Sequence, residues 1–63
     1  MQLIDTTFGE LEGGDLFTCD GKNYRKLYCT YNNNIQKRDN AVCLSIGVEC
    51  YIPDDCEVLK IEN

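Results

Sequence analysis

Short apolar runs separated by glycine, proline, asparagine and aspartate are the dominant pattern along this chain. Within the runs, apolar and polar residues tend to alternate, and no stretch repeats its apolar positions at the 3.6-residue period of a long helix. The pattern predicts about five short β-strands, at residues 16–19, 23–29, 41–44, 48–52 and 57–61. Residues 3–4 could add a short edge strand.

Turn residues between these runs predict tight connections. Asp20-Gly21 is a strong hairpin signal, because both central residues of a type I′ turn need a positive φ. Gly47 marks a second hairpin, and Gly13-Gly14-Asp15 predicts a turn before strand 16–19. Pro53-Asp54-Asp55 should end the strand that precedes it, because proline lacks an amide donor and aspartate favours turns.

The 63 residues are enough for one domain. Phe8 and Leu11 are three positions apart, which suits a single helical or 3₁₀ turn placed over the core. Short strands joined by tight turns can bury one core by curling into a small antiparallel meander. We therefore expect an all-β protein whose sheet forms an SH3-like partial barrel.

A chain of this length buries only about 60% of the surface that its unfolded form exposes, so its core is marginal. Such a core is often stabilised further by disulfides, a metal or a partner subunit, so the sequence is compatible with a homo-dimer. The cysteine count is odd, there is no C-x-x-C pair, and the chain has no histidine. We expect mostly free thiols that pack as small hydrophobes, with one or two disulfides or a metal site as alternatives. The five cysteines are Cys19, Cys29, Cys43, Cys50 and Cys56.

The net charge of -5 is unevenly distributed. Five of the six basic residues, and none of the eleven acids, lie between Gly21 and Arg38. Aromatic rings can stack on bases and cations can hold phosphates, so this basic segment is a candidate ligand surface, although a solvated strand face would show the same pattern. In the expected strand 23–29, Tyr24 and Lys26 share one face and Arg25 lies on the other. The candidate ligand-binding residues are Tyr24, Arg25, Lys26, Tyr31, Lys37 and Arg38.

The acidic remainder of the chain permits a different partner. A small acidic protein can bind a basic surface on a target, and its electric field would raise the encounter rate. The same charge could serve only to keep a small domain soluble. A negatively charged chain is a poor candidate for binding long nucleic acids, which usually select domains with a clear positive excess.

Catalysis is disfavoured by what the sequence lacks. The absence of histidine removes the commonest general base and the commonest metal ligand. There is no phosphate-binding loop, nucleophile-elbow or zinc-protease motif, and Asp54-Asp55 are adjacent turn residues that we expect to be solvated. A meander of this size also has little volume for a dry active-site cavity. We therefore expect neither an enzyme, nor a cofactor, nor a metal centre.

Several landmarks in order suggest a family. Residues 8–17 fit the pattern F-x-x-L-x-x-G-D-x-F, and residues 21–26 fit G-x-x-Y-x-K. Asn40-Ala41-Val42-Cys43-Leu44, Gly47 and Tyr51-Ile52-Pro53-Asp54-Asp55 follow. Over about residues 8 to 59 the chain resembles small, mostly uncharacterised β proteins encoded by bacteriophages and prophages. These motifs consist of turn and core residues, so they imply fold more than function, and no site residue is carried over.

The resemblance implies an accessory protein that acts in the cytoplasm of an infected bacterium. This agrees with the N-terminal residues, which lack the regions of a signal peptide, and with the absence of an apolar run near the roughly 20 residues of a membrane span. The first hypothesis is a non-enzymatic inhibitor that binds a host protein, of defence or of housekeeping, through a loop or an edge strand. The alternatives are a sponge-like binder that sequesters a nucleotide or other small phosphorylated signal, and a structural or assembly module.

Overall fold

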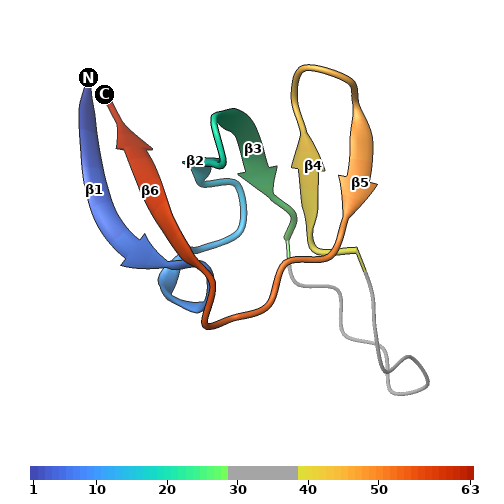
Figure 1. Ribbon diagram of the computed structural model, residues 1–63, viewed down its shortest axis with the longest axis horizontal. Coiled ribbons are helices and arrows are strands. Elements are labelled where there is room, and N and C mark those ends of the chain that lie inside the picture. The colour runs from blue at the N-terminus through green and yellow to red at the C-terminus, as the bar shows by residue number, and fades with distance from the viewer. Residues whose placement is uncertain (29–38) are drawn as a thin grey trace.

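The computed structural model describes residues 1–28 and 39–63, and in these residues six strands form one antiparallel sheet (Figure 1). The chain contributes one more strand than expected because residues 2–7 form a full edge strand. In chain order the elements are β1 (Gln2–Thr7), the 3₁₀ turn η1 (Phe8–Glu10), β2 (Leu16–Cys19), β3 (Lys22–Lys26), β4 (Ala41–Cys43), β5 (Val48–Cys50) and β6 (Glu57–Glu62).

The strand order is β1-β6-β2-β3-β4-β5. Strands β2 to β5 follow one another as a meander, whereas β6 returns to lie between β1 and β2. The two chain ends therefore lie side by side, and the sheet curls so that β1–β6 and β4–β5 form two arms (Figure 1). The fold is all-β as expected, and the sheet is a partial barrel that does not close.

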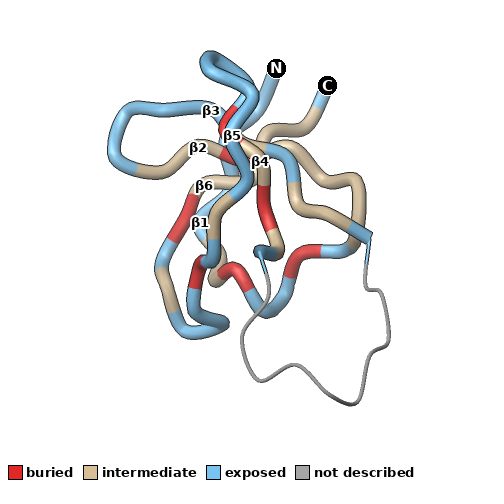
Figure 2. The backbone as a smooth tube through the Cα atoms, turned by 90° about the vertical axis from the view of Figure 1, so that its right-hand side faces the viewer, coloured by how far each residue is buried: buried red, intermediate tan, exposed pale blue. Residues whose placement is uncertain are grey.

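The concave face of the curled sheet carries the core. Phe8 and Phe17 are the fully buried large side chains, and their rings meet edge to face with centroids 5.4 Å apart at 74°. Figure 2 shows that the buried segments belong both to strands and to the connections between them. The core cluster consists of Phe8, Leu11, Phe17, Ala41, Ile52 and Val58. A single curled sheet thus replaces the second layer that a flat sheet would need.

Three local predictions are confirmed. Phe8 begins η1 and Leu11 follows it, both are buried, and the Leu11 amide donates to the Phe8 carbonyl at 3.1 Å. Asp20 and Gly21 have φ values of 54° and 76°, as a two-residue type I′ hairpin requires. The turn at Gly13 and Gly14 is also where it was expected.

Two strands end at least two residues before their expected positions. Strand β3 ends at Lys26 rather than near residue 29, and Cys29 lies outside the described residues. Strand β5 ends at Cys50 rather than at Ile52. Ile52 leaves the ladder because its backbone pairs with a side chain: its amide donates to Asn40 Oδ1 at 2.8 Å, and its carbonyl accepts from Asn40 Nδ2 at 2.9 Å.

Candidate binding surfaces

Tyr24, the aromatic residue placed first among the candidate ligand contacts, belongs to the core side of β3. Its ring stacks on Phe17 with centroids 5.4 Å apart and an angle of 11° between the ring planes. Burial raises the pKa of the Tyr24 phenol above its ordinary value. One face of this ring is therefore already occupied by Phe17, which limits what it can offer to a ligand.

Lys26 also lies on the core side, and its ammonium is engaged. Lys26 Nζ donates to the Leu11 carbonyl at 2.6 Å and to the Phe8 carbonyl at 3.0 Å. The same nitrogen lies 4.5 Å from the centroid of the Phe8 ring, within reach of a cation–π interaction. Lys26 thus binds one carbonyl at the start of η1 and one directly after it, which is a structural role.

Arg25 is exposed and points to the opposite, convex face of the sheet, between Leu16 of β2 and Val42 of β4. The structure therefore separates Arg25 from Tyr24 and Lys26 by the thickness of the sheet. The other three candidate contacts, Tyr31, Lys37 and Arg38, lie outside the described residues. The predicted basic ligand surface stays a prediction, and no two of its described members share an open surface.

Four cysteines occur among the described residues, and all are free thiols. Cys19, Cys50 and Cys56 pack against the core from the partly open side, and burial raises the pKa of Cys19 and Cys50. Cys43 lies 3.4 Å from the Ser45 hydroxyl, and this hydrogen bond lowers the pKa of the Cys43 thiol. Residues 1–28 and 39–63 contain no group of three or more such side chains placed to hold a metal ion.

The β4–β5 hairpin presents an exposed apolar surface that the sequence reasoning missed. Ile46 at the turn is 69% exposed, and Leu44, Val48 and Tyr51 are each about half exposed. We call these four residues the hairpin surface. The signal was present in the sequence, because the connection Leu44-Ser45-Ile46-Gly47 holds two large aliphatic residues and no charge. Hairpin turns are usually polar, so exposed aliphatic residues clustered on one hairpin indicate a binding surface.

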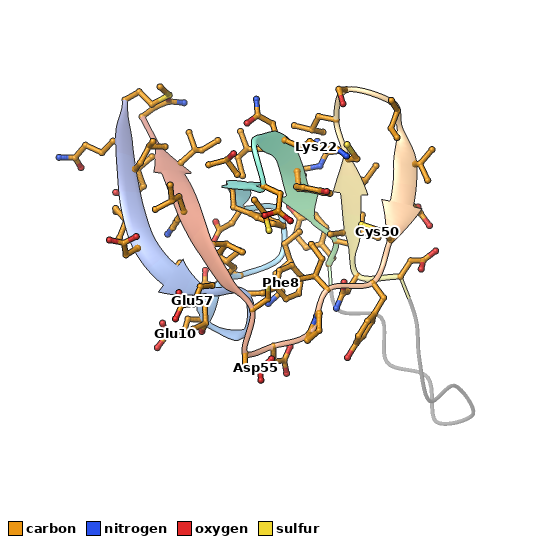
Figure 3. The ribbon with its side chains drawn as sticks, in the orientation of Figure 1. Phe8, Glu10, Lys22, Cys50, Asp55 and Glu57 are labelled. Carbon is orange, nitrogen blue, oxygen red and sulfur yellow. The ribbon has the colours of Figure 1, made fainter. Side chains whose placement is uncertain are left out.

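A second surface lies at the other side of the sheet, where acidic residues gather. Asp5, Asp20 and Glu57 line an open hollow of about 310 Å³ together with Thr18 and Leu59. We call it the acidic hollow. Figure 3 shows Glu57 and Glu10 at the end of β1 and β6, and Glu10 is held there by Thr6, whose hydroxyl donates to its carboxylate at 2.7 Å.

In comparisons with known proteins, no family model, no curated protein and no solved structure matches this chain. The described residues include no helix with the length and apolar character of a membrane span. The hairpin surface and the acidic hollow are therefore the features that bear on function.

Proposed function

We propose that this protein is a non-catalytic phage accessory protein that inhibits a host protein by binding it through the hairpin surface. The observation that carries the proposal is that four of the eight exposed large hydrophobic residues among the described residues lie within this one stretch, residues 44–51. Exposed apolar residues gathered on one structural element commonly mark interaction sites on small soluble proteins. The resemblance to phage-encoded β proteins supports the setting, the cytoplasm of an infected bacterium.

The hairpin is held in place at both ends. At its turn, the Gly47 amide donates to the Cys43 carbonyl at 2.7 Å, and the Leu44 amide donates to the Asn23 carbonyl of β3 at 2.9 Å. At its base, the Asn40 side chain forms its two hydrogen bonds with the backbone of Ile52. A contact surface fixed before binding loses little conformational entropy on association, which favours affinity.

The net charge of -5 adds a second element to the proposal. Acidic residues outside the apolar contact would steer the protein toward a basic target surface and raise the association rate. Surface electrostatics of this kind weakens with salt, whereas the apolar contact does not. The complex should therefore form more slowly at high ionic strength but still depend on Ile46 under all conditions.

The nucleotide-sequestering alternative has less support in the described residues. Tyr24 stacks on Phe17 and Lys26 binds two backbone carbonyls, so neither side chain is free for a phosphorylated ligand. Arg25 lies on the opposite face. For these reasons we favour a protein partner.

The test is a pull-down from lysate of the host bacterium with matched variants. Ile46→Ser removes the most exposed side chain of the hairpin surface, and Asp55→Ser changes an exposed turn residue at the opposite end of the strands from the β4–β5 turn (Figure 3). The proposal predicts one stoichiometric partner for the unaltered protein and for Asp55→Ser, and a loss of about tenfold or more in affinity for Ile46→Ser. Equal recovery of the partner by both variants would contradict it.

A further inference from the structure

Strand β1 has one edge whose backbone groups pair with no other strand of the described residues. It pairs only with β6 among the described residues, and the sheet order places it at the edge. The Phe8 amide donates to the Cys56 carbonyl at 2.9 Å. This hydrogen bond identifies which opposite residues of β1 and β6 exchange backbone hydrogen bonds. Bonded and non-bonded pairs alternate in an antiparallel ladder, so Leu3, Asp5 and Thr7 direct their peptide groups away from β6, toward the open edge.

The side chains of Leu3 and Asp5 begin two rows on the convex face. Cross-strand pairing continues the first row from Leu3 through Ile61 to Leu16. It continues the second row from Asp5 through Leu59 to Thr18. Residues directly opposite each other in a sheet share a face, so these two rows place three further aliphatic residues on the same face as Leu3 and Asp5. Ile61, Leu16 and Leu59 are half-buried, and no other element of the described residues covers them.

The border of this apolar area is acidic. Asp5, Asp20 and Glu57 surround Leu59 in the acidic hollow, and a neighbouring hollow shares Asp5 and Glu57 with Thr6 and Thr7. Both hollows are lined without any lysine or arginine among the described residues. The ion pairs in the described part of the chain join Lys60 to Asp15 and to Glu62, so they leave these three carboxylates unneutralised.

We propose that the open edge of β1 binds an extended basic segment of another protein, added to the sheet as a seventh strand. A partner residue opposite Asp5 would place a lysine or arginine in the acidic hollow, with its aliphatic stem on Leu59. A partner residue opposite Leu3, two positions away, would place an aliphatic side chain beside Leu3, at the end of the row that continues to Ile61. The recognised chemistry is thus one basic and one aliphatic residue two positions apart in an extended segment, held by main-chain hydrogen bonds.

The negative charge of the chain favours a basic segment of another protein at this edge over a second copy of the chain. Two copies paired through β1 would each bring a net charge of -5 and would juxtapose their unneutralised carboxylates. Like charges placed together across an interface oppose association. The β1 surface is separate from the hairpin surface, so this inference stands or falls independently of the proposed function.

The test uses a capped synthetic peptide that repeats Lys-Thr-Val-Thr, which places lysine and valine two positions apart, with ¹⁵N-labelled protein. We expect backbone amide shifts concentrated at Leu3, Asp5 and Thr7, together with slowed hydrogen exchange there. The double variant Asp5→Asn, Glu57→Gln should weaken binding by about tenfold or more. The control pair Glu49→Gln, Asp54→Asn removes the same charge elsewhere and should change affinity by less than about threefold. Ile46→Ser should leave peptide binding unchanged.

Two further peptides separate strand addition from general attraction of opposite charges. A peptide of the same composition that repeats Lys-Val-Thr-Thr should bind more weakly, because its lysines and valines are never two positions apart, so it cannot place a base opposite Asp5 and an aliphatic residue opposite Leu3. A peptide methylated on the backbone nitrogens that face β1 should also bind more weakly. Equal binding of all three peptides, equal weakening in both charge pairs, or shifts away from β1 would overturn the inference.

Discussion

Lys26 and Leu11 are 15 positions apart in the chain, yet the Lys26 ammonium donates to the Leu11 carbonyl at 2.6 Å. The contact joins the end of the 3₁₀ turn to the centre of the sheet, beside a second bond to the Phe8 carbonyl. A hydrogen bond from a charged donor is roughly twice as strong as a neutral one. Because Phe8 and Leu11 are both in the core, Lys26 fixes the element that closes the concave face.

Replacing Lys26 with methionine should destabilise the fold. The aliphatic stem is kept, but two partly buried carbonyls lose their charged donor, which should lower the free energy of unfolding by about 2 kcal/mol. The measurement is urea unfolding followed by circular dichroism. Lys22→Met is the matched control, because Lys22 is exposed on the same strand and should change stability by less than about 0.5 kcal/mol. Equal effects of the two variants would show that the Lys26 contacts contribute nothing.

Asn40→Ala should weaken the base of the β4–β5 hairpin. The Asn40 amide group imitates a neighbouring strand by donating to and accepting from the backbone of Ile52. Loss of both hydrogen bonds should reduce stability by about 2 kcal/mol, at about 1 kcal/mol each. Asn23→Ala, at an exposed position of β3, serves as the control. Thermal unfolding of both variants decides the point, and a Tm for Asn40→Ala equal to that of the control would disprove it.

Stability should fall in alkaline solution. Burial raises the pKa of Cys19, Tyr24 and Cys50 in the folded protein. Each group therefore loses its proton first in the unfolded chain, so folding is favoured fully at neutral pH and less and less as pH rises from the unfolded pKa toward the folded one. The lowered pKa of Cys43 makes stability rise with pH instead. Because it is one group against the three whose pKa is raised, we expect a net loss of stability.

The measurement is the urea midpoint between pH 7 and pH 10.5 in the presence of a reductant. We expect a plateau near neutrality and a decline from about pH 9, the ordinary pKa of a thiol. The double variant Cys19→Ala, Tyr24→Phe should show a shallower decline, because two of the three groups are gone. A midpoint constant up to pH 10.5 in the unaltered protein would refute this account of the buried groups.

Nucleotides should leave the melting temperature unchanged. A ligand present at about 100 times its Kd stabilises the native state by about 2.7 kcal/mol, which raises the Tm of a small domain by about 10 °C or more. A panel of cyclic and linear nucleotides at about 1 mM therefore detects any site with a Kd near 10 µM. A shift for one of them would favour the sequestering alternative over the hairpin surface.

The strands and turns could be predicted because they depend on local sequence. The alternation around Phe17 and Val58, the spacing of Phe8 and Leu11, and the Asp20-Gly21 dipeptide each act within a few residues. The position of β6 between β1 and β2 could not be predicted in the same way. It depends on pairing between residues that are 50 to 60 positions apart in the chain, which no local pattern encodes.

The candidate site was harder to predict than the fold, for reasons visible at single residues. Placing Tyr24 and Lys26 on one face of β3 was right, but that face turned out to be the core side. A lysine can lie there because its long stem carries the ammonium to the edge of the core, where two carbonyls accept its hydrogen bonds. The hairpin surface was missed because Gly47 indicated a turn, and turns are expected to be polar. In this turn Leu44 and Ile46 are apolar and exposed.

The most direct test of the proposed function is photo-crosslinking inside the host bacterium. A photoreactive phenylalanine derivative at position 46 would lie on the hairpin surface, and the same group at position 55 would lie at the opposite end of the strands from the β4–β5 turn (Figure 3). The proposal predicts a single crosslinked host protein from position 46 and none from position 55. Crosslinking of that protein from position 55 alone, or no crosslink from position 46 in cells where the protein is active, would contradict it.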